Sequence, residues 1–275
     1  MAEPSTVTEA PPHLQTLLSL RGKTAVITGG ARGLGYEMMK GLAESGANVA
    51  CIDVLAETAA LAVSKLAQEC HVEATSWGCD VTNDEEVAMV FDSIAQHHGS
   101  IDVLVTAAGI NKVCAALDYK AEEMRRIMDV NFSGTFFCAQ QAAKHMIARN
   151  TRGSIVFISS MSAVITNRPN FHCAYNASKA AVSQLTRSLA CEWAPYNIRV
   201  TAISPGHFET EMVRQLSADQ KAAGIKAQEI WESNTPMARL GQPYELKGVV
   251  AFLASEASSF VTGTEILVDG GQTAW

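Results

Sequence analysis

The sequence lacks any pair of cysteines at the spacing of a metal or redox motif. Its seven cysteines stand singly along the 275 residues and form no Cys-x-x-Cys pair. An odd number of scattered cysteines is not typical of a disulfide framework, so we expect reduced, mostly buried thiols in a reducing compartment. No metal site is expected.

Basic runs and long apolar runs are missing too. The net charge is −7 and the isoelectric point about 5.5. Electrostatic attraction therefore does not support binding to nucleic acid or to an anionic membrane. No apolar run approaches the roughly 18 residues of a membrane span. Residues 1–12 have neither the basic nor the apolar part of a secretory signal, and their two glutamates argue against a mitochondrial presequence. We expect a soluble, cytoplasmic protein in which residues 1–17 form a loose tail.

What the sequence has is an alternation of short apolar runs with longer helical stretches. After residue 20 no linker, repeat or low-complexity segment interrupts it, so residues 18–275 are predicted to form one domain. Continuous apolar strands separated by helices indicate a parallel sheet buried on both faces, with helices on each side. The predicted fold class is therefore an α/β, doubly wound parallel sheet. Strands are expected at 24–28, 48–53, 73–79, 102–105, 154–158, 198–203 and 266–268, and helices up to 45 and near 56–70, 84–98, 121–148, 174–194 and 243–254.

A glycine-rich turn follows the first predicted strand and opens a helix, the context that a dinucleotide site requires. Gly29 permits the tight turn, and Gly33 lets the backbone approach a pyrophosphate. Gly35 permits close packing of the helix on the sheet, and the helix N-terminus faces the phosphate charge. The sequence thus predicts a site for a nicotinamide dinucleotide.

Two acidic residues stand at strand ends beyond this turn. Asp53 ends the second strand, where a carboxylate accepts hydrogen bonds from the adenosine ribose and repels a 2′-phosphate. Arg32 acts in the opposite sense, because it could pair with that phosphate. We expect NAD(H) rather than NADP(H), since the carboxylate is aimed at the 2′ position. Asp80 ends the third strand and could reach the adenine, or alternatively serve as N-cap of the next helix.

Tyr175 and Lys179 lie four residues apart, on one face of a predicted helix. A phenol is a poor base at neutral pH, and a nearby cation should lower its pKa toward the working pH. Tyr175 is then a candidate general acid and base for a carbonyl oxygen. Serines 159, 160 and 162 follow the fifth predicted strand, at the sheet edge where ligands bind. Asn131 is a polar residue in an apolar helical stretch, either an ordinary helix amide or the holder of a relay water.

Together these motifs resemble the short-chain dehydrogenase/reductase family over residues 21–275. The resemblance implies a Rossmann-type fold and a catalytic tetrad of Asn131, Ser160, Tyr175 and Lys179. Ser160 would hold the substrate oxygen and Tyr175 would transfer the proton. Lys179 would bind the nicotinamide ribose, and Asn131 would position a water. Cofactor contacts implied by the resemblance are Gly29, Arg32, Gly33, Leu34, Gly35, Asp53, Asp80, Val81, Ala108, Gly109, Tyr175, Lys179, Pro205, Gly206, Phe208 and Thr210.

Two departures from the family pattern bear on the site. The family often carries Asn-Asn-Ala-Gly after the fourth strand, but this sequence has Thr106-Ala-Ala-Gly109, which leaves local sheet hydrogen bonds in doubt. The interval from Ser160 to Tyr175 is fifteen residues, against thirteen in most members, an interval that Ser162 would satisfy. The Ile-Ser-Ser context favours Ser160, and Ser162 remains the alternative.

The subfamily can be narrowed by the segment from Ser160 to Tyr175 and by the ending Asp269-Gly-Gly-Gln-Thr-Ala-Trp275, which resemble fungal polyol dehydrogenases and ketose reductases. We therefore expect a polyol or ketose as substrate. The alternatives are a reductase of a fungal secondary metabolite and, more remotely, a non-catalytic dinucleotide sensor. Residues 207–238 should form a substrate lid. Family resemblance also implies a homotetramer, paired through 121–148, 174–194 and the C-terminal strand.

Overall fold

The computed structural model describes residues 12–222 and 224–275, so most of the predicted N-terminal tail lies outside the described part. In the described part of the predicted tail, a short helix, α1 (Leu14–Leu18), forms where a loose tail was expected, and none of its residues is buried. In the described chain no helix has both the length and the apolar character to cross a membrane.

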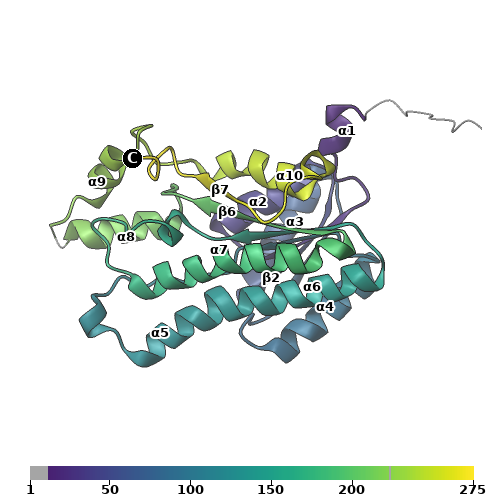
Figure 1. Ribbon diagram of the computed structural model, residues 1–275, viewed down its shortest axis with the longest axis horizontal. Coiled ribbons are helices and arrows are strands. Elements are labelled where there is room, and N and C mark those ends of the chain that lie inside the picture. The colour runs from purple at the N-terminus through teal and green to yellow at the C-terminus, as the bar shows by residue number, and fades with distance from the viewer. Residues whose placement is uncertain (1–11, 223) are drawn as a thin grey trace, which may run out of the picture.

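A seven-stranded, wholly parallel sheet forms the centre of the molecule, with the order β3-β2-β1-β4-β5-β6-β7 (Figure 1). The strand order reverses between β1 and β4, which is where ligands bind in doubly wound sheets. The strands are β1 (Thr24–Thr28), β2 (Asn48–Asp53), β3 (Ala74–Gly78), β4 (Val103–Thr106), β5 (Gly153–Ile158), β6 (Ile198–Pro205) and β7 (Glu265–Val268).

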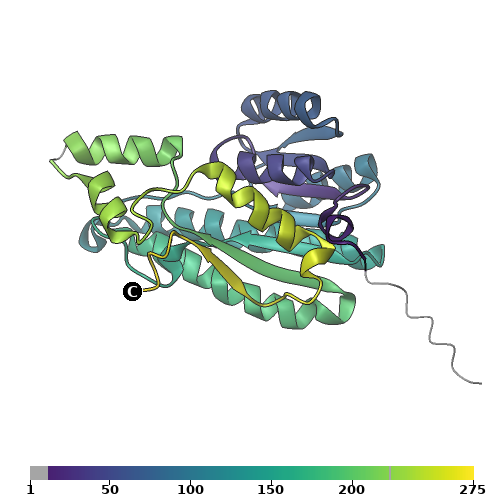
Figure 2. The same cartoon turned by 90° about the horizontal axis from the view of Figure 1, so that it is seen from above.

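Helices cover both faces of the sheet, as Figures 1 and 2 show. The remaining helices are α2 (Gly33–Glu44), α3 (Ala56–Cys70), α4 (Asp84–His98), α5 (Ala121–Met128), α6 (Gly134–Ala148), α7 (Cys173–Trp193), α8 (Glu211–Ala222), α9 (Ala227–Asn234) and α10 (Lys247–Ala254). Side chains from α4, α6 and α7 fill one core layer, and those from α2, α3 and α10 fill the other. The predicted fold class is confirmed.

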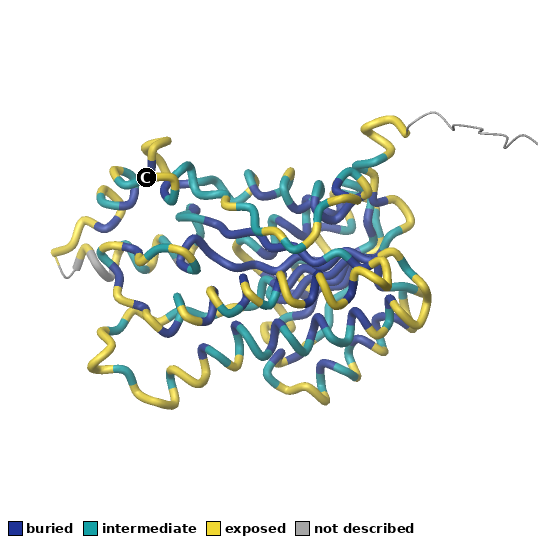
Figure 3. The backbone as a smooth tube through the Cα atoms, viewed as in Figure 1, coloured by how far each residue is buried: buried dark blue, intermediate teal, exposed yellow. Residues whose placement is uncertain are grey.

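The inner strands are mostly apolar because each face carries its own core, whereas no residue of the edge strands β3 and β7 is buried. In β1, Ala25 and Ile27 point into the layer under α2, whereas Val26 points into the layer under α6. Figure 3 shows the strands as the continuous buried centre of the molecule. Burial of apolar side chains on both faces provides the main stabilisation of such a sheet.

One predicted helix is not regular. The stretch 121–148 divides into α5 and α6 around a π-helical turn, Asp129–Ser133, which contains Asn131. π-Turns inside helices occur mostly at functional sites, because they push one side chain out of the regular helical register. The prediction of a helical stretch at 121–148 is confirmed, and the π-turn inside it is a feature that helical periodicity does not reveal.

The seven cysteines are all free. Cys51, Cys79 and Cys138 are buried, and burial raises the pKa of the Cys51 and Cys79 thiols to about 12. Cys173 and Cys191 are exposed, so the expectation of mostly buried thiols holds for only part of the set.

Candidate active site

The candidate site lies at the carboxyl ends of the central strands. Register places Thr28 of β1 beside Thr106 of β4, and Thr106 beside Phe157 of β5. The glycine turn, the segment after β4 and the serine cluster therefore leave the sheet next to one another. The substitutions after β4 do not weaken this edge, because Ala107 N donates to the Thr28 carbonyl at 3.0 Å and Ala108 N donates to Thr28 Oγ1 at 3.2 Å.

The glycine turn is shaped by close backbone approach. Gly29 has φ +69°, and a Cβ there would lie 2.6 Å from Ala108 N. Gly33 has φ +61°, but a Cβ there would meet nothing within 4 Å. A Cβ on Gly35 would collide with the Gly29 carbonyl oxygen. Gly35 therefore packs against the turn, whereas the sequence predicted packing against the sheet. Gly33 thus marks the open side of the cradle.

Asp53 is bound to this turn. Its Oδ2 accepts a hydrogen bond from Ala31 N at 3.0 Å, and its Oδ1 accepts one from Leu55 N at 3.0 Å. Arg32, the next residue of the turn, is exposed, and Leu34 is partly buried against the core. Arg32 therefore belongs to the turn, and Asp53, at the end of β2, is joined to it by the bond from Ala31, the residue before Arg32.

Asp80 does not cap α4. The N-cap is Asn83, whose Oδ1 accepts from Glu86 N at 3.1 Å, while Asp80 accepts from Thr82 N at 3.0 Å and Thr82 Oγ1 at 2.8 Å. The N-cap alternative for Asp80 was wrong, because Asn83 stands one residue before the helix and takes that position. Val81 is buried in the core and leaves no room for a side chain at Gly134, 2.7 Å from its Cγ2.

Asn131 is fully buried, and its side-chain amide links two segments of the chain, unlike an ordinary helix amide. Its Oδ1 accepts from Ile110 N at 2.8 Å, and its Nδ2 donates to the Ile110 carbonyl and to Ser178 Oγ, both at 3.0 Å. The amide therefore joins the segment after β4 to α7, one residue from Lys179. Next to it, a Cβ at Gly109 would lie 3.7 Å from Lys179 Nζ.

Tyr175 and Lys179 lie one turn apart at the start of α7, as the spacing predicts. Lys179 Nζ donates to the Ile158 carbonyl at 2.7 Å and lies 5.6 Å from the centroid of the Tyr175 ring. Burial raises the pKa of Tyr175, a hydrogen bond with Ser160 opposes that change, and burial lowers the pKa of Lys179 to about 8. The expectation that Lys179 lowers the tyrosine pKa is not met here, because the ammonium is turned to the Ile158 carbonyl and desolvation dominates.

The three serines after β5 have different partners. Ser159 Oγ contacts the Lys179 carbonyl at 3.0 Å and Ser183 Oγ at 2.8 Å. Ser160 is the serine hydrogen-bonded to Tyr175, and its Oγ also accepts from Ser162 N at 3.1 Å. Ser162 Oγ instead accepts from Asn167 Nδ2 at 2.5 Å.

The segment after β6 runs along the end of β7. A Cβ on Gly206, the residue after Pro205, would lie 2.7 Å from Asp269 Cα. Phe208 is buried and packs against Gly241, so its side chain belongs to the core. Thr210 Oγ1 accepts from Val213 N at 3.3 Å, at the start of α8.

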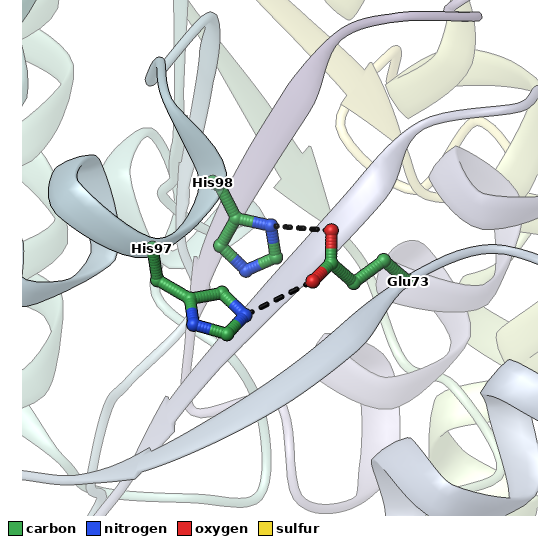
Figure 4. Close-up of side chains that lie close together, drawn as sticks. All are labelled: Glu73, His97 and His98. Carbon is green, nitrogen blue, oxygen red and sulfur yellow. Dashed lines mark hydrogen bonds and ion pairs between the residues drawn. The ribbon is translucent and has the colours of Figure 1, made fainter.

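A group of ligand-type side chains that the sequence reasoning missed lies away from this cleft (Figure 4). Glu73, before β3, bridges two histidines at the end of α4: His97 Nε2 lies 3.0 Å from Oε1, and His98 Nδ1 lies 3.5 Å from Oε2. Thr75 Oγ1 contacts His98 Nε2 at 2.8 Å. These contacts tie the edge strand to α4. Burial lowers the pKa of His98 despite the carboxylate beside it.

Comparison with known proteins agrees with this geometry. The family model described as Enoyl-(Acyl carrier protein) reductase matches residues 29–273. A solved short-chain type dehydrogenase/reductase from Mycobacterium marinum is 40% identical, covers 94% of this chain and 98% of its own, and superposes with a TM-score of 0.88. The chain belongs to the short-chain dehydrogenase/reductase family. It is an oxidoreductase that transfers a hydride between a nicotinamide cofactor and an alcohol or ketone.

Characterised relatives are similar over nearly their whole length. The ribulose-forming D-arabinitol 2-dehydrogenase of Scheffersomyces stipitis is 42% identical over 269 residues, 93% of this chain and 95% of the relative. The sorbose reductase of Schizosaccharomyces pombe is 36% identical over 260 residues, 94% and 98% of the two chains. This agrees with the predicted resemblance to fungal polyol dehydrogenases and ketose reductases.

Solved members of the family carry either cofactor. An NAD⁺-bound xylitol dehydrogenase is 35% identical, with a TM-score of 0.85 and coverage of 92% of this chain and 99% of its own. A gluconate 5-dehydrogenase from Burkholderia cenocepacia J2315, in complex with NADP and tartrate, is also 35% identical, with a TM-score of 0.89 and coverage of 96% and 100%.

Proposed function

We propose that this oxidoreductase interconverts a polyol and a ketose, with NAD(H) as its cofactor. The observation that carries the proposal is the arrangement at the end of β5, where Ser160 hydrogen-bonds Tyr175 and Lys179 lies under the tyrosine ring. Relatives named for D-arabinitol and sorbose support this substrate class over a secondary-metabolite ketone or a non-catalytic sensor.

The chain's residues fit a nicotinamide dinucleotide. Gly33 leaves one side of the turn open, and Gly29 and Gly109 bring backbone close to the cleft. When bound, the cofactor exchanges a hydride with the carbinol carbon of the substrate. The residues we propose to hold it are Gly29, Arg32, Gly33, Leu34, Gly35, Asp53, Asp80, Val81, Ala108, Gly109, Tyr175, Lys179, Pro205, Gly206, Phe208 and Thr210.

In the proposed mechanism Ser160 donates a hydrogen bond to the substrate oxygen, and Tyr175 carries its proton. In ketose reduction the phenol gives its proton to the carbonyl oxygen; in polyol oxidation the phenolate takes the hydroxyl proton. Because burial raises the pKa of Tyr175, the phenol is protonated at neutral pH and ready for reduction. Oxidation should accelerate as pH rises and the phenolate forms.

Lys179 and Asn131 complete the proposed tetrad. Lys179 would bind the nicotinamide ribose, and its pKa near 8 allows it to gain or lose a proton close to neutral pH. Asn131 holds the backbone that faces Lys179 through its bonds to Ile110 and Ser178. We propose that the relay water sits beside this amide, where one lone pair of Oδ1 is not committed to Ile110.

The preference for NAD(H) rests on Asp53. Its carboxylate accepts from the backbone N–H of Ala31 in the glycine turn and from that of Leu55 after β2, whereas Arg32 is exposed. A 2′-phosphate brought to that carboxylate would place like charges together in a partly desolvated cleft.

The assay that tests the proposal measures initial rates with polyols and ketoses of four to six carbons, with NAD(H) and NADP(H) in parallel. We expect turnover of at least one polyol–ketose pair, with higher kcat/KM for NAD(H). Turnover confined to an enoyl thioester or to a bulky aromatic ketone would refute the proposed substrate class.

We further propose that the protein acts in the cytoplasm as a homotetramer. The free cysteines support a reducing compartment. β7 is an outer strand of the described sheet, and Leu267 and Trp275 near it are 42% and 78% exposed, which supports a contact there. Sedimentation equilibrium tests the tetramer, and a monomer at micromolar concentration would contradict it.

A further inference from the structure

Buried polar atoms without a hydrogen-bond partner lie beside Tyr175. His172 precedes α7 and is 5% exposed, and its ring centroid lies 5.4 Å from that of Tyr175. Asn111 Nδ2 contacts His172 Nδ1 at 3.3 Å. Within the described residues, His172 Nε2 and Asn111 Oδ1 have no partner. Because Nδ1 accepts from the amide, the ring proton sits on Nε2 and is free to donate.

A second histidine lies in the loop after β6, the strand that pairs with β5. The His207 ring stacks on Trp231 of α9, with centroids 4.6 Å apart and planes at 25°. Its Nε2 is buried without a partner among the described residues. Burial lowers the pKa of His207 to about 4, and His172 is close enough to add to that effect. The two histidines are therefore electrostatic neighbours.

Such unsatisfied groups are rare in folded proteins, because a buried donor or acceptor without a partner is costly. Burial also lowers the pKa of His172, so both imidazoles are neutral at physiological pH. A neutral imidazole offers one donor and one acceptor, and a hydroxyl group offers the same pair. A ligand with several hydroxyls can satisfy both rings, whereas a hydrocarbon cannot.

We propose that His172 and His207 form a hydroxyl-binding subsite next to Tyr175, which recognises a neutral polyol or ketose and disfavours a sugar acid. The inference rests on the proposed function, since it names which part of the cleft selects the substrate. Trp231 acts as a positioning residue, because its stacking fixes the plane of the His207 ring. Figures 1 and 2 show its helix, α9, beyond the end of the sheet where β6 finishes.

The charges of neighbouring loops agree with a neutral ligand. Lys112 is ion-paired with Glu123, and Arg239 is ion-paired with Glu245. Arg168 is exposed on the loop that follows the serine cluster. A neutral imidazole supplies no charge to compensate the desolvation of a carboxylate, and Arg168 is the arginine of that loop to test as a partner for one.

The experiment compares three substrates: xylitol, the monohydric 2-pentanol, and gluconate. His207→Phe keeps an aromatic ring for Trp231 but loses Nε2, and His172→Phe does the same beside Tyr175. His172→Gln restores a donor and an acceptor. Arg168→Gln is the matched control for an anionic subsite. Thermal unfolding of every variant reports whether the fold is retained.

We expect each Phe variant to lower the ratio of kcat/KM for xylitol to that for 2-pentanol by about tenfold or more, mainly through KM, and His172→Gln to recover part of it. Arg168→Gln should leave xylitol kinetics unchanged. An equal loss of kcat/KM for xylitol and for 2-pentanol would show that the histidines have a structural role only, and it would overturn the proposed subsite. Wild-type turnover of gluconate that exceeds xylitol and depends on Arg168 would overturn it as well.

The proposed function can be refuted independently of the subsite. If the wild-type protein oxidises 2-pentanol but no polyol, the substrate class is wrong whatever the histidine variants do. If wild-type turnover of xylitol is robust and the Phe variants match it, only the subsite is wrong.

Discussion

The two halves of the cleft are built from different materials. The cofactor half, as we call the side of β1 and β4 where most of the proposed cofactor contacts lie, is mainly backbone: a Cβ on Gly29 would lie 2.6 Å from Ala108 N, and Ala31 N donates to the Asp53 carboxylate. The substrate half, as we call the side between β5 and β7 where the proposed substrate contacts lie, contains buried polar side chains; among the described residues, His172 and His207 each have a ring nitrogen without a hydrogen-bond partner.

This difference shows how the fold separates binding from selection. A backbone cradle is preformed, since it is complete without a ligand and its hydrogen bonds are made within the chain. Unpaired side chains are completed only by a ligand with matching hydroxyls, and they therefore discriminate between substrates. Changes in one half should leave the binding properties of the other intact.

The largest effect is expected when the transferred proton is removed, because catalysis should be lost while cofactor binding is kept. Tyr175→Phe keeps the ring that packs against His172 and removes only the transferable hydrogen. We expect kcat to fall by roughly 10²–10⁴, the usual scale for a general acid and base. NADH affinity, measured by fluorescence titration, should stay near the wild-type value. Activity within a few-fold of wild type would remove Tyr175 from the mechanism.

The next effect lies within the substrate half. Ser160→Ala removes the hydroxyl bonded to Tyr175 and should lower kcat by roughly 10²–10³, as loss of one donor to a reacting oxygen does. Ser162→Ala, its matched control two residues away, loses the contact with Asn167 and should change KM more than kcat. Steady-state kinetics with one polyol compare them, and the reverse ranking would transfer the role to Ser162.

A change confined to the cofactor half is expected from Asp53→Ser. Like-charge repulsion of a 2′-phosphate by a carboxylate is worth on the order of a hundredfold in affinity. The variant should narrow or reverse the preference for NAD(H), because the repulsion is gone and Arg32 is free to pair. The KM for the polyol should stay near the wild-type value. If the wild-type protein already prefers NADP(H), Arg32 dominates and the cofactor assignment is wrong.

The smallest effect concerns stability and pH. Burial lowers the folded-state pKa of His98, His172 and His207, the last to about 4, below the unfolded value near 6.5. Between these values the unfolded chain binds more protons, so the free energy of unfolding should decrease as pH falls from about 6.5 to 4. Glu245, whose pKa the bond from Arg239 lowers to about 2, loses its contribution only below about 4.5.

Thermal unfolding at a series of pH values checks this. His207→Phe, which has no proton to bind, should flatten the slope between pH 6.5 and 4. The same slope in wild type and variant would show that this ring does not titrate in that window.

The sequence predicted the backbone half better than the side-chain half. The glycine turn is local in the chain, and Asp53, 22 residues from Ala31, is predicted because the strand–helix–strand pattern brings the end of the second strand beside that turn. His172, His207 and Trp231 come from segments more than twenty residues apart, and Glu73 lies as far from His97 and His98. No local pattern brings such residues together. Asn131 stays a predicted site residue, and helical periodicity contains no sign of the π-turn that holds it against α7.

The most direct test of hydride transfer to a sugar carbonyl uses NADH labelled with deuterium at the transferable position. Wild-type protein, a ketose and this cofactor are incubated, and the polyol product is examined by NMR. The account predicts one deuterium on the newly formed carbinol carbon and none elsewhere, with no label when Tyr175→Phe replaces the wild type. Oxidation of the cofactor without deuterium in the polyol, or deuterium at a carbon that was never a carbonyl, would contradict it.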